Sequence, residues 1–143
     1  MKPKFLLRLA ALFVLLHLIG HSIGALTWKQ SPNAAIGRVI NSMQTQHFDF
    51  MGRSVTLGNF YSGYGFTMLF VLGLLVVLFW QLSNNPENRM TTRLLLPLST
   101  YLLIQGVLEF IYFFPFAAII SLLAAISGFV ALMSIWSLKP GTI

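Results

Sequence analysis

Three side chains inside apolar stretches of the sequence carry the groups best suited to chemistry, one carboxylate and two imidazoles. Glu109 is one of only three acidic residues in 143, and it lies within a long, mainly apolar run. His17 and His21 lie four residues apart in another apolar run, so on a helix they share one face. A carboxylate in hydrocarbon is costly and is usually paired or functional. As one hypothesis, Glu109 acts as a general acid and base on a lipid-like substrate, with His21 or His17 as its proton partner.

Polar residues around Glu109 recur at helical spacing and predict a single polar stripe along one helix. The spacing between successive members is four, four and three residues, which keeps them on one side of an α-helix. A polar stripe on a helix in lipid is expected to face the interior of the protein. The members of the stripe are Tyr101, Gln105, Glu109 and Tyr112.

Antiparallel helices are expected to gather these polar groups in the outer half of the bundle. Each residue rises about 1.5 Å along a helix, and this places His21 level with Glu109 and His17 level with Gln105. The start of the second span lies just above this layer. We therefore predict five ligand-binding residues there: Gln105, Tyr112, Tyr64, Tyr61 and Tyr101.

Two other interpretations of the same residues remain open. In one, Glu109 and the histidines are hydrogen-bonded core groups that hold the helices in register. In the other, His17, His21 and Glu109 form a two-histidine, one-carboxylate metal site, or His47 folds back to complete a haem site. The HxxxH spacing is common by chance, and the sequence has no HExxH motif. We therefore assign no metal and no cofactor.

The composition requires a membrane. Hydrophobic residues make up 57% of the chain and charged residues 8%, whereas soluble domains carry about 25% charged residues. The net charge is +6, but the cations lie near the ends of apolar runs and form no nucleic-acid motif, so no nucleic-acid partner is expected. The chain has no cysteine, which excludes disulfides, thiolate nucleophiles and iron–sulfur clusters.

The apolar runs predict an all-α fold, an up-down bundle of four transmembrane helices in a single domain, residues 1–143. The last two runs form one stretch too long for a single crossing, so the chain is expected to turn at Phe114-Pro115. The outer loop, residues 27–63, is expected to be structured, with a short amphipathic helix on the membrane surface and a small β-hairpin. The four predicted spans are residues 5–26, 64–82, 94–113 and 116–138.

The basic residues predict the orientation of the chain. One group flanks the predicted inner ends of the helices: Lys2, Lys4, Arg8, Arg89, Arg93 and Lys139. A smaller group lies in the long outer loop: Lys29, Arg38 and Arg53. The positive-inside rule then places both termini in the cytoplasm. The first apolar run could instead be a signal peptide cleaved near Gly24, but its length and its two histidines favour a retained helix.

Two short motifs carry a resemblance. His17-x-x-Gly20-His21-x-x-Gly24, followed by Asn59-Phe60-Tyr61-x-Gly63-Tyr64-Gly65, resembles a group of small four-span bacterial membrane proteins of unknown function. This resemblance implies a bacterial inner-membrane location. The acid and histidines inside a four-span bundle are also similar to the sterol-isomerase and sigma-2-receptor fold family. Those proteins place acidic and histidine side chains in a membrane cavity for apolar amines or sterols, but they carry paired acids, whereas Glu109 is the only acid within the predicted spans.

The sequence thus predicts a small integral membrane protein that binds or interacts through a polar layer. Its expected partners are the lipid bilayer and either an apolar small molecule or a transmembrane helix of another protein. The alternatives are a membrane enzyme that uses Glu109 and His21 as acid and base, and a metal- or haem-binding protein.

Overall fold

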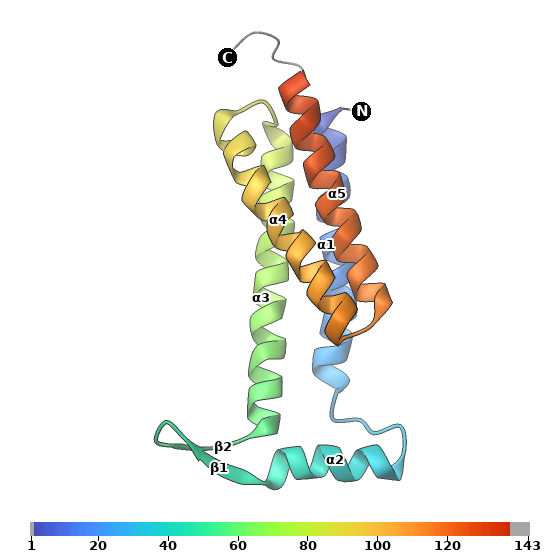
Figure 1. Ribbon diagram of the computed structural model, residues 1–143, viewed down its shortest axis with the longest axis vertical. Coiled ribbons are helices and arrows are strands. Elements are labelled where there is room, and N and C mark those ends of the chain that lie inside the picture. The colour runs from blue at the N-terminus through green and yellow to red at the C-terminus, as the bar shows by residue number, and fades with distance from the viewer. Residues whose placement is uncertain (1, 138–143) are drawn as a thin grey trace. The chain divides into compact units, whose positions relative to one another are not determined.

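The computed structural model describes residues 2–137 and confirms the predicted all-α membrane fold (Figure 1). Four of its helices, α1, α3, α4 and α5, are long and apolar enough to cross a membrane. The chain is therefore a multi-pass membrane protein. Within the described residues, the elements follow in the order α1 (Pro3–Thr27), α2 (Ala34–Thr45), β1 (His47–Phe50), β2 (Arg53–Thr56), α3 (Leu57–Asn84), α4 (Arg89–Tyr112) and α5 (Pro115–Ser137).

The second long helix begins seven residues earlier than the sequence predicted, at Leu57 in place of residue 64. Its start is fixed by Thr56 and Asn59, which cap each other. Asn59 Oδ1 accepts hydrogen bonds from the backbone N (2.9 Å) and Oγ1 (3.0 Å) of Thr56, and the backbone N of Asn59 donates to Thr56 Oγ1 (3.1 Å). Such reciprocal bonds satisfy donors at the first turn of a helix. The glycine- and aromatic-rich patch at residues 58–65 is therefore helical.

The turn predicted at Phe114-Pro115 separates the last two helices. Helix α4 ends at Tyr112, and Pro115 is the first residue of α5. Proline suits this first position because its missing N–H would have no partner within the helix. At the other end of α4, Asn88 Oδ1 accepts from the backbone N of Met90 (2.8 Å) and caps the helix. Residue 138, the predicted end of the fourth span, and Lys139 lie outside the described residues.

The contacts divide the chain into two compact units. We call residues 2–19 and 72–137 the bundle unit, and residues 20–71 the loop unit. Helices α1 and α3 each contribute one part to each unit, whereas α4 and α5 belong wholly to the bundle unit.

The bundle unit is built around α5, which has the largest buried share of the four long helices. Its buried face consists mainly of alanine, serine and glycine, so neighbouring helices can approach closely. Large side chains from the other helices fill the space around it, and their opposite faces expose further apolar side chains, as expected for contact with lipid. The fully buried large side chains of α1, α3 and α4 include Leu7, Val14, Leu72, Phe79, Leu95 and Leu102.

Two glycines set the spacing between α4 and α5, which form an antiparallel hairpin (Figure 1). A Cβ added to Gly106 would lie 2.9 Å from the side chain of Leu122 and 3.3 Å from the carbonyl oxygen of Ala118. A Cβ added to Gly128 would collide with Oγ of Ser99. At Gly106 and at Gly128 the two helices therefore lie so close together that a side chain larger than hydrogen would collide with the neighbouring helix.

The loop unit holds the amphipathic helix and the hairpin that the sequence predicted. Asn33 caps α2 through its Oδ1, which accepts from the backbone N of Ile36 (3.0 Å). Strands β1 and β2 pair antiparallel, with His47 opposite Thr56 and Phe50 opposite Arg53. The connecting residues Met51 and Gly52 both have positive φ, 51° and 82°, as a two-residue hairpin turn requires.

Aromatic contacts hold the loop unit together. The ring of Trp28 lies 4.8 Å from that of Tyr61, and both Phe48 and Phe50 lie against Phe60 in the first turn of α3, at 6.1 and 5.4 Å between centroids. The hairpin is therefore fastened to α3 through one aromatic face.

Candidate functional site

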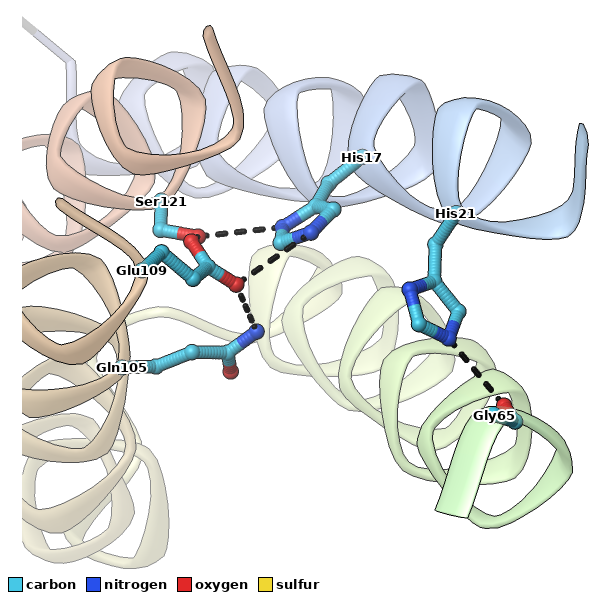
Figure 2. Close-up of polar contacts among 6 residues, drawn as sticks. All are labelled: His17, His21, Gly65, Gln105, Glu109 and Ser121. Carbon is cyan, nitrogen blue, oxygen red and sulfur yellow. Dashed lines mark hydrogen bonds and ion pairs between the residues drawn. The ribbon is translucent and has the colours of Figure 1, made fainter. Parts of the chain in front are cut away.

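Four polar side chains meet in the interior of the bundle unit (Figure 2). Glu109 and Gln105 come from α4, His17 from α1 and Ser121 from α5. Glu109 Oε1 lies 3.3 Å from His17 Nε2 and accepts a hydrogen bond from Gln105 Nε2 (2.8 Å). Glu109 Oε2 accepts from Ser121 Oγ (2.7 Å). We call these four residues the polar cluster.

Ser121 closes the polar cluster into a ring. Its Oγ lies 3.0 Å from His17 Nδ1 as well as 2.7 Å from Glu109 Oε2. A hydroxyl has a single hydrogen, and an ionised carboxylate can only accept. With Glu109 ionised, Ser121 donates to Oε2 of Glu109 and accepts from Nδ1 of His17. The ring runs from the carboxyl group through the hydroxyl to the imidazole and back to the carboxyl group.

The remaining contact of the ring joins the imidazole to the carboxyl group. His17 Nε2 lies 3.3 Å from Glu109 Oε1, which is an ion pair when the imidazole is protonated. A protonated imidazole and an ionised carboxylate together carry no net charge. A neutral, internally bonded pair is the form in which an acid and a histidine are least costly in hydrocarbon.

The polar cluster is shielded from the surroundings. Glu109 and His17 are each 7% exposed, and Ser121 is 1% exposed. Glu109 therefore has an ion-pair or hydrogen-bond partner on both oxygens, and all of those partners belong to this chain. Such a set of contacts within the chain can hold helices in register.

The local sequence explains how each side chain reaches the polar cluster. Gln105 and Glu109 are four residues apart on α4, so the amide lies one turn from the carboxyl group. Gly106, on the same face, lets α5 come close enough for Ser121 to reach Glu109. His17 belongs to the buried face of α1, one turn beyond Val14.

Of the residues predicted as catalytic, the structure brings Glu109 and His17 together (Figure 2). His21 belongs to the loop unit, where its Nε2 lies 3.1 Å from the carbonyl oxygen of Gly65. That contact joins the last turns of α1 to the first turns of α3. The predicted common level of His21 and Glu109 stays a prediction.

The predicted ligand-binding residues are divided between several places. Gln105 is buried in the polar cluster. Tyr112 is 74% exposed and Tyr101 is also exposed, so these two do not belong to the buried face of α4. In the loop unit, Tyr61 contacts Trp28, and Tyr64 is exposed.

The buried face of α4 is centred away from the two tyrosines. It passes through Leu95, Ser99 and Leu102 before it reaches Gln105 and Glu109. On a helix this line is displaced from Tyr101 and Tyr112 by roughly a quarter turn. The predicted stripe followed polarity alone, and the packing of apolar and small residues decided which part of it faces inward.

Ser121 was not predicted as part of the site. In the sequence it lies in a row of small residues with Ala117 and Ala125, a pattern that indicates close helix packing. The only available signal was that this row contains a hydroxyl, and a hydroxyl in lipid needs a partner. No group of three histidine, cysteine, aspartate or glutamate side chains that could hold a metal ion occurs among residues 2–137.

Fold and site together define a class, the multi-pass α-helical membrane proteins with a buried acid–histidine pair. Comparisons with protein-family models, with curated proteins and with solved structures find no match to this chain. The resemblances noted from the sequence motifs therefore stay predictions.

Proposed function

We propose that this chain is a binding protein of a bacterial plasma membrane, whose partner is an apolar or amphipathic molecule or a transmembrane helix of another protein. In this proposal the polar cluster performs no chemistry. It fixes α1 against the α4–α5 hairpin and so maintains the outer faces of the helices on which binding depends.

The closed ring of polar contacts is the observation that carries this proposal. A general acid or base has to exchange a proton with its substrate at hydrogen-bond distance. The carboxyl oxygens of Glu109 and the ring nitrogens of His17 already face one another, Ser121 and Gln105. A substrate would first have to break those contacts in the buried interior of the bundle unit.

The same geometry argues against a serine nucleophile. In a catalytic triad the serine hydroxyl donates to the histidine, and the carboxylate orients the other ring nitrogen. Here the single hydrogen of Ser121 is directed to Glu109, and the hydroxyl is 1% exposed. In some helical proteins, buried polar groups specify how helices pair even where they add little net stability.

The orientation that we propose follows from the charges. Lys2, Lys4, Arg8, Arg89 and Arg93 flank the ends of α1 and α4 that would face the cytoplasm. Both termini then lie inside the cell, and α2 and the β1–β2 hairpin lie on the outer side of the membrane.

Chemical labelling of Glu109 tests whether the polar cluster is closed. A hydrophobic carbodiimide reaches carboxyl groups from the lipid phase and adds to them as a stable acylurea, which mass spectrometry detects. We expect Glu109 of the folded chain in membranes to label far more slowly than Glu109 of the chain unfolded in SDS. The reason is that both carboxyl oxygens are bonded and the side chain is buried.

A pair of serine variants provides the control for the labelling. Ser121→Ala removes one of the bonds to Glu109 and should speed labelling, whereas Ser127→Ala removes a hydroxyl that bonds only to the Leu123 carbonyl oxygen of its own helix. Equal labelling rates in the folded and unfolded chain would mean that Glu109 is accessible, and the proposal of a purely structural cluster would then be wrong.

Native mass spectrometry tests the binding role itself. The chain released from lipid nanodiscs should retain a molecule or partner chain of one defined mass, above the distribution of bulk lipids. The control is Glu87→Ala, which changes an exposed side chain in the connection between α3 and α4, away from the outer faces of the long helices, and should leave the retained mass unchanged. A chain that carries only the bulk lipid distribution contradicts a binding function.

A further inference from the structure

Helix α2 in the loop unit has one apolar side that residues 2–137 do not cover fully. Ile36, Val39, Ile40 and Met43 recur at helical spacing, and none of the residues of α2 is buried. Arg38 lies on the opposite side of the helix, together with Asn41 and Thr45. A short helix with this pattern is typical of segments that lie in a membrane interface.

The β1–β2 hairpin carries a second exposed apolar surface, at its tip. Its aromatic face lies against Phe60 in the first turn of α3, so it is directed toward a helix that continues as a membrane span. Met51 at the tip of the hairpin is 91% exposed. A methionine at the end of a turn contributes nothing to the core, and its exposure in water is unfavourable.

The position of these elements places both apolar groups near the ends of membrane spans. Figure 1 shows α2 and the hairpin beyond the ends of α1 and α3 that belong to the loop unit, and running across them. The contact between Trp28 and Tyr61 lies where these two helices meet the loop, and both residue types are enriched at membrane–water interfaces. Trp28 and Tyr61 are thus of the residue types expected at the level of the lipid headgroups.

The charge of the loop unit is positive. Residues 20–71 contain three cations, Lys29, Arg38 and Arg53, and one acid, Asp49, which gives +3 − 1 = +2 with histidines neutral. All four of these side chains are exposed. Basic side chains at this level are attracted to the phosphates of anionic lipids.

We infer that α2 and the hairpin together form a platform that docks on a bilayer surface containing anionic phospholipid. The apolar side of α2 and the Met51 tip enter the boundary between headgroups and acyl chains, and the three cations contact lipid phosphates. The platform does not depend on the binding function proposed above, because it involves only residues of the loop unit.

Single-cysteine spin labels on the full chain test this inference, since the natural sequence has no cysteine. The labelled positions are Met51→Cys at the hairpin tip and, as the matched control, Asn41→Cys on the polar side of α2. The chain is placed in nanodiscs of phosphatidylcholine alone or of phosphatidylcholine with phosphatidylglycerol. Collision with apolar oxygen and with a neutral, water-soluble nickel complex then reports whether each label lies in lipid or in water.

In nanodiscs with phosphatidylglycerol, we expect the label at residue 51 to collide mainly with oxygen and the label at residue 41 mainly with nickel. The difference between the two labels in their collisions with oxygen and nickel should be smaller in phosphatidylcholine alone. It should also be smaller in the Arg38→Gln, Arg53→Gln variant than in the chain with both arginines. Val39→Cys, on the apolar side of α2, is a second reporter in case the tip variant fails to fold.

Three results would overturn the inference. The labels at residues 39 and 51 could be as accessible to nickel as the label at residue 41 in both lipid compositions. They could be equally immersed with and without phosphatidylglycerol, in which case the cations play no part. They could also be shielded in native membranes but not in nanodiscs, which would assign the platform to a protein partner.

Discussion

Glu109→Ala is expected to lower the free energy of unfolding by about 3 kcal/mol, because removing one member of a buried pair leaves its partners without their acceptor. His17, Ser121 and Gln105 all direct polar atoms to this carboxyl group. The free energy can be measured by SDS titration in mixed micelles, followed by far-ultraviolet circular dichroism. Glu109→Gln, which keeps the size and part of the hydrogen bonding, should lose less.

Glu87→Ala is the matched control for this experiment. Glu87 is exposed in the connection between α3 and α4, and its replacement should change stability by no more than about 0.5 kcal/mol. If Glu109→Ala were as stable as Glu87→Ala, or more stable than the natural chain, the polar cluster would not hold the helices together. A gain would point to a functional site, since functional groups often cost stability.

Gly128→Ala should have the second largest effect, a loss of about 2 kcal/mol from overpacking the contact between α4 and α5. The added methyl group would meet Ser99 Oγ at a distance where no atom fits, and would lie 3.5 Å from Phe79 Cε1. Phe79 and Ser99 are both fully buried, so neither can move aside without disturbing its neighbours. The same titration measures the loss.

Ser99→Ala should compensate for the loss of stability caused by Gly128→Ala. Ser99 Oγ is buried and has no hydrogen-bond partner among the described residues, so Ser99→Ala alone should be neutral or stabilising. Combined with Gly128→Ala, it removes the colliding atom and should restore most of the lost stability. Failure of the double variant to recover would show that the cost at residue 128 comes from another neighbour.

Much of the fold could be predicted from composition and spacing. Long apolar runs indicate spans because hydrocarbon tolerates few charges, and Pro115 marked the only place where the last run could turn. The start of α3 could not be placed, because the glycines and aromatics at residues 58–65 are typical of a loop. The mutual cap of Thr56 and Asn59 outweighs that local preference.

The polar cluster was predicted in part. The sequence singled out Glu109, His17 and Gln105 because polar groups in apolar runs are rare and costly. It could not separate His17 from His21, since both lie on the same side of α1 and differ only in depth. Ser121 remained hidden because its partner on α1 is 104 residues away in the chain, a distance over which helical periodicity carries no information.

That same sequence separation has a consequence for biosynthesis. Synthesis proceeds at about 5 to 20 residues per second, so the 104 residues between His17 and Ser121 correspond to a delay of about 5 to 20 s. During this interval the first helix is already at the insertion machinery while its hydroxyl partner has not been translated. The contact of His17 with Ser121 cannot exist before then, and the ring can form only when the final helix packs against the first.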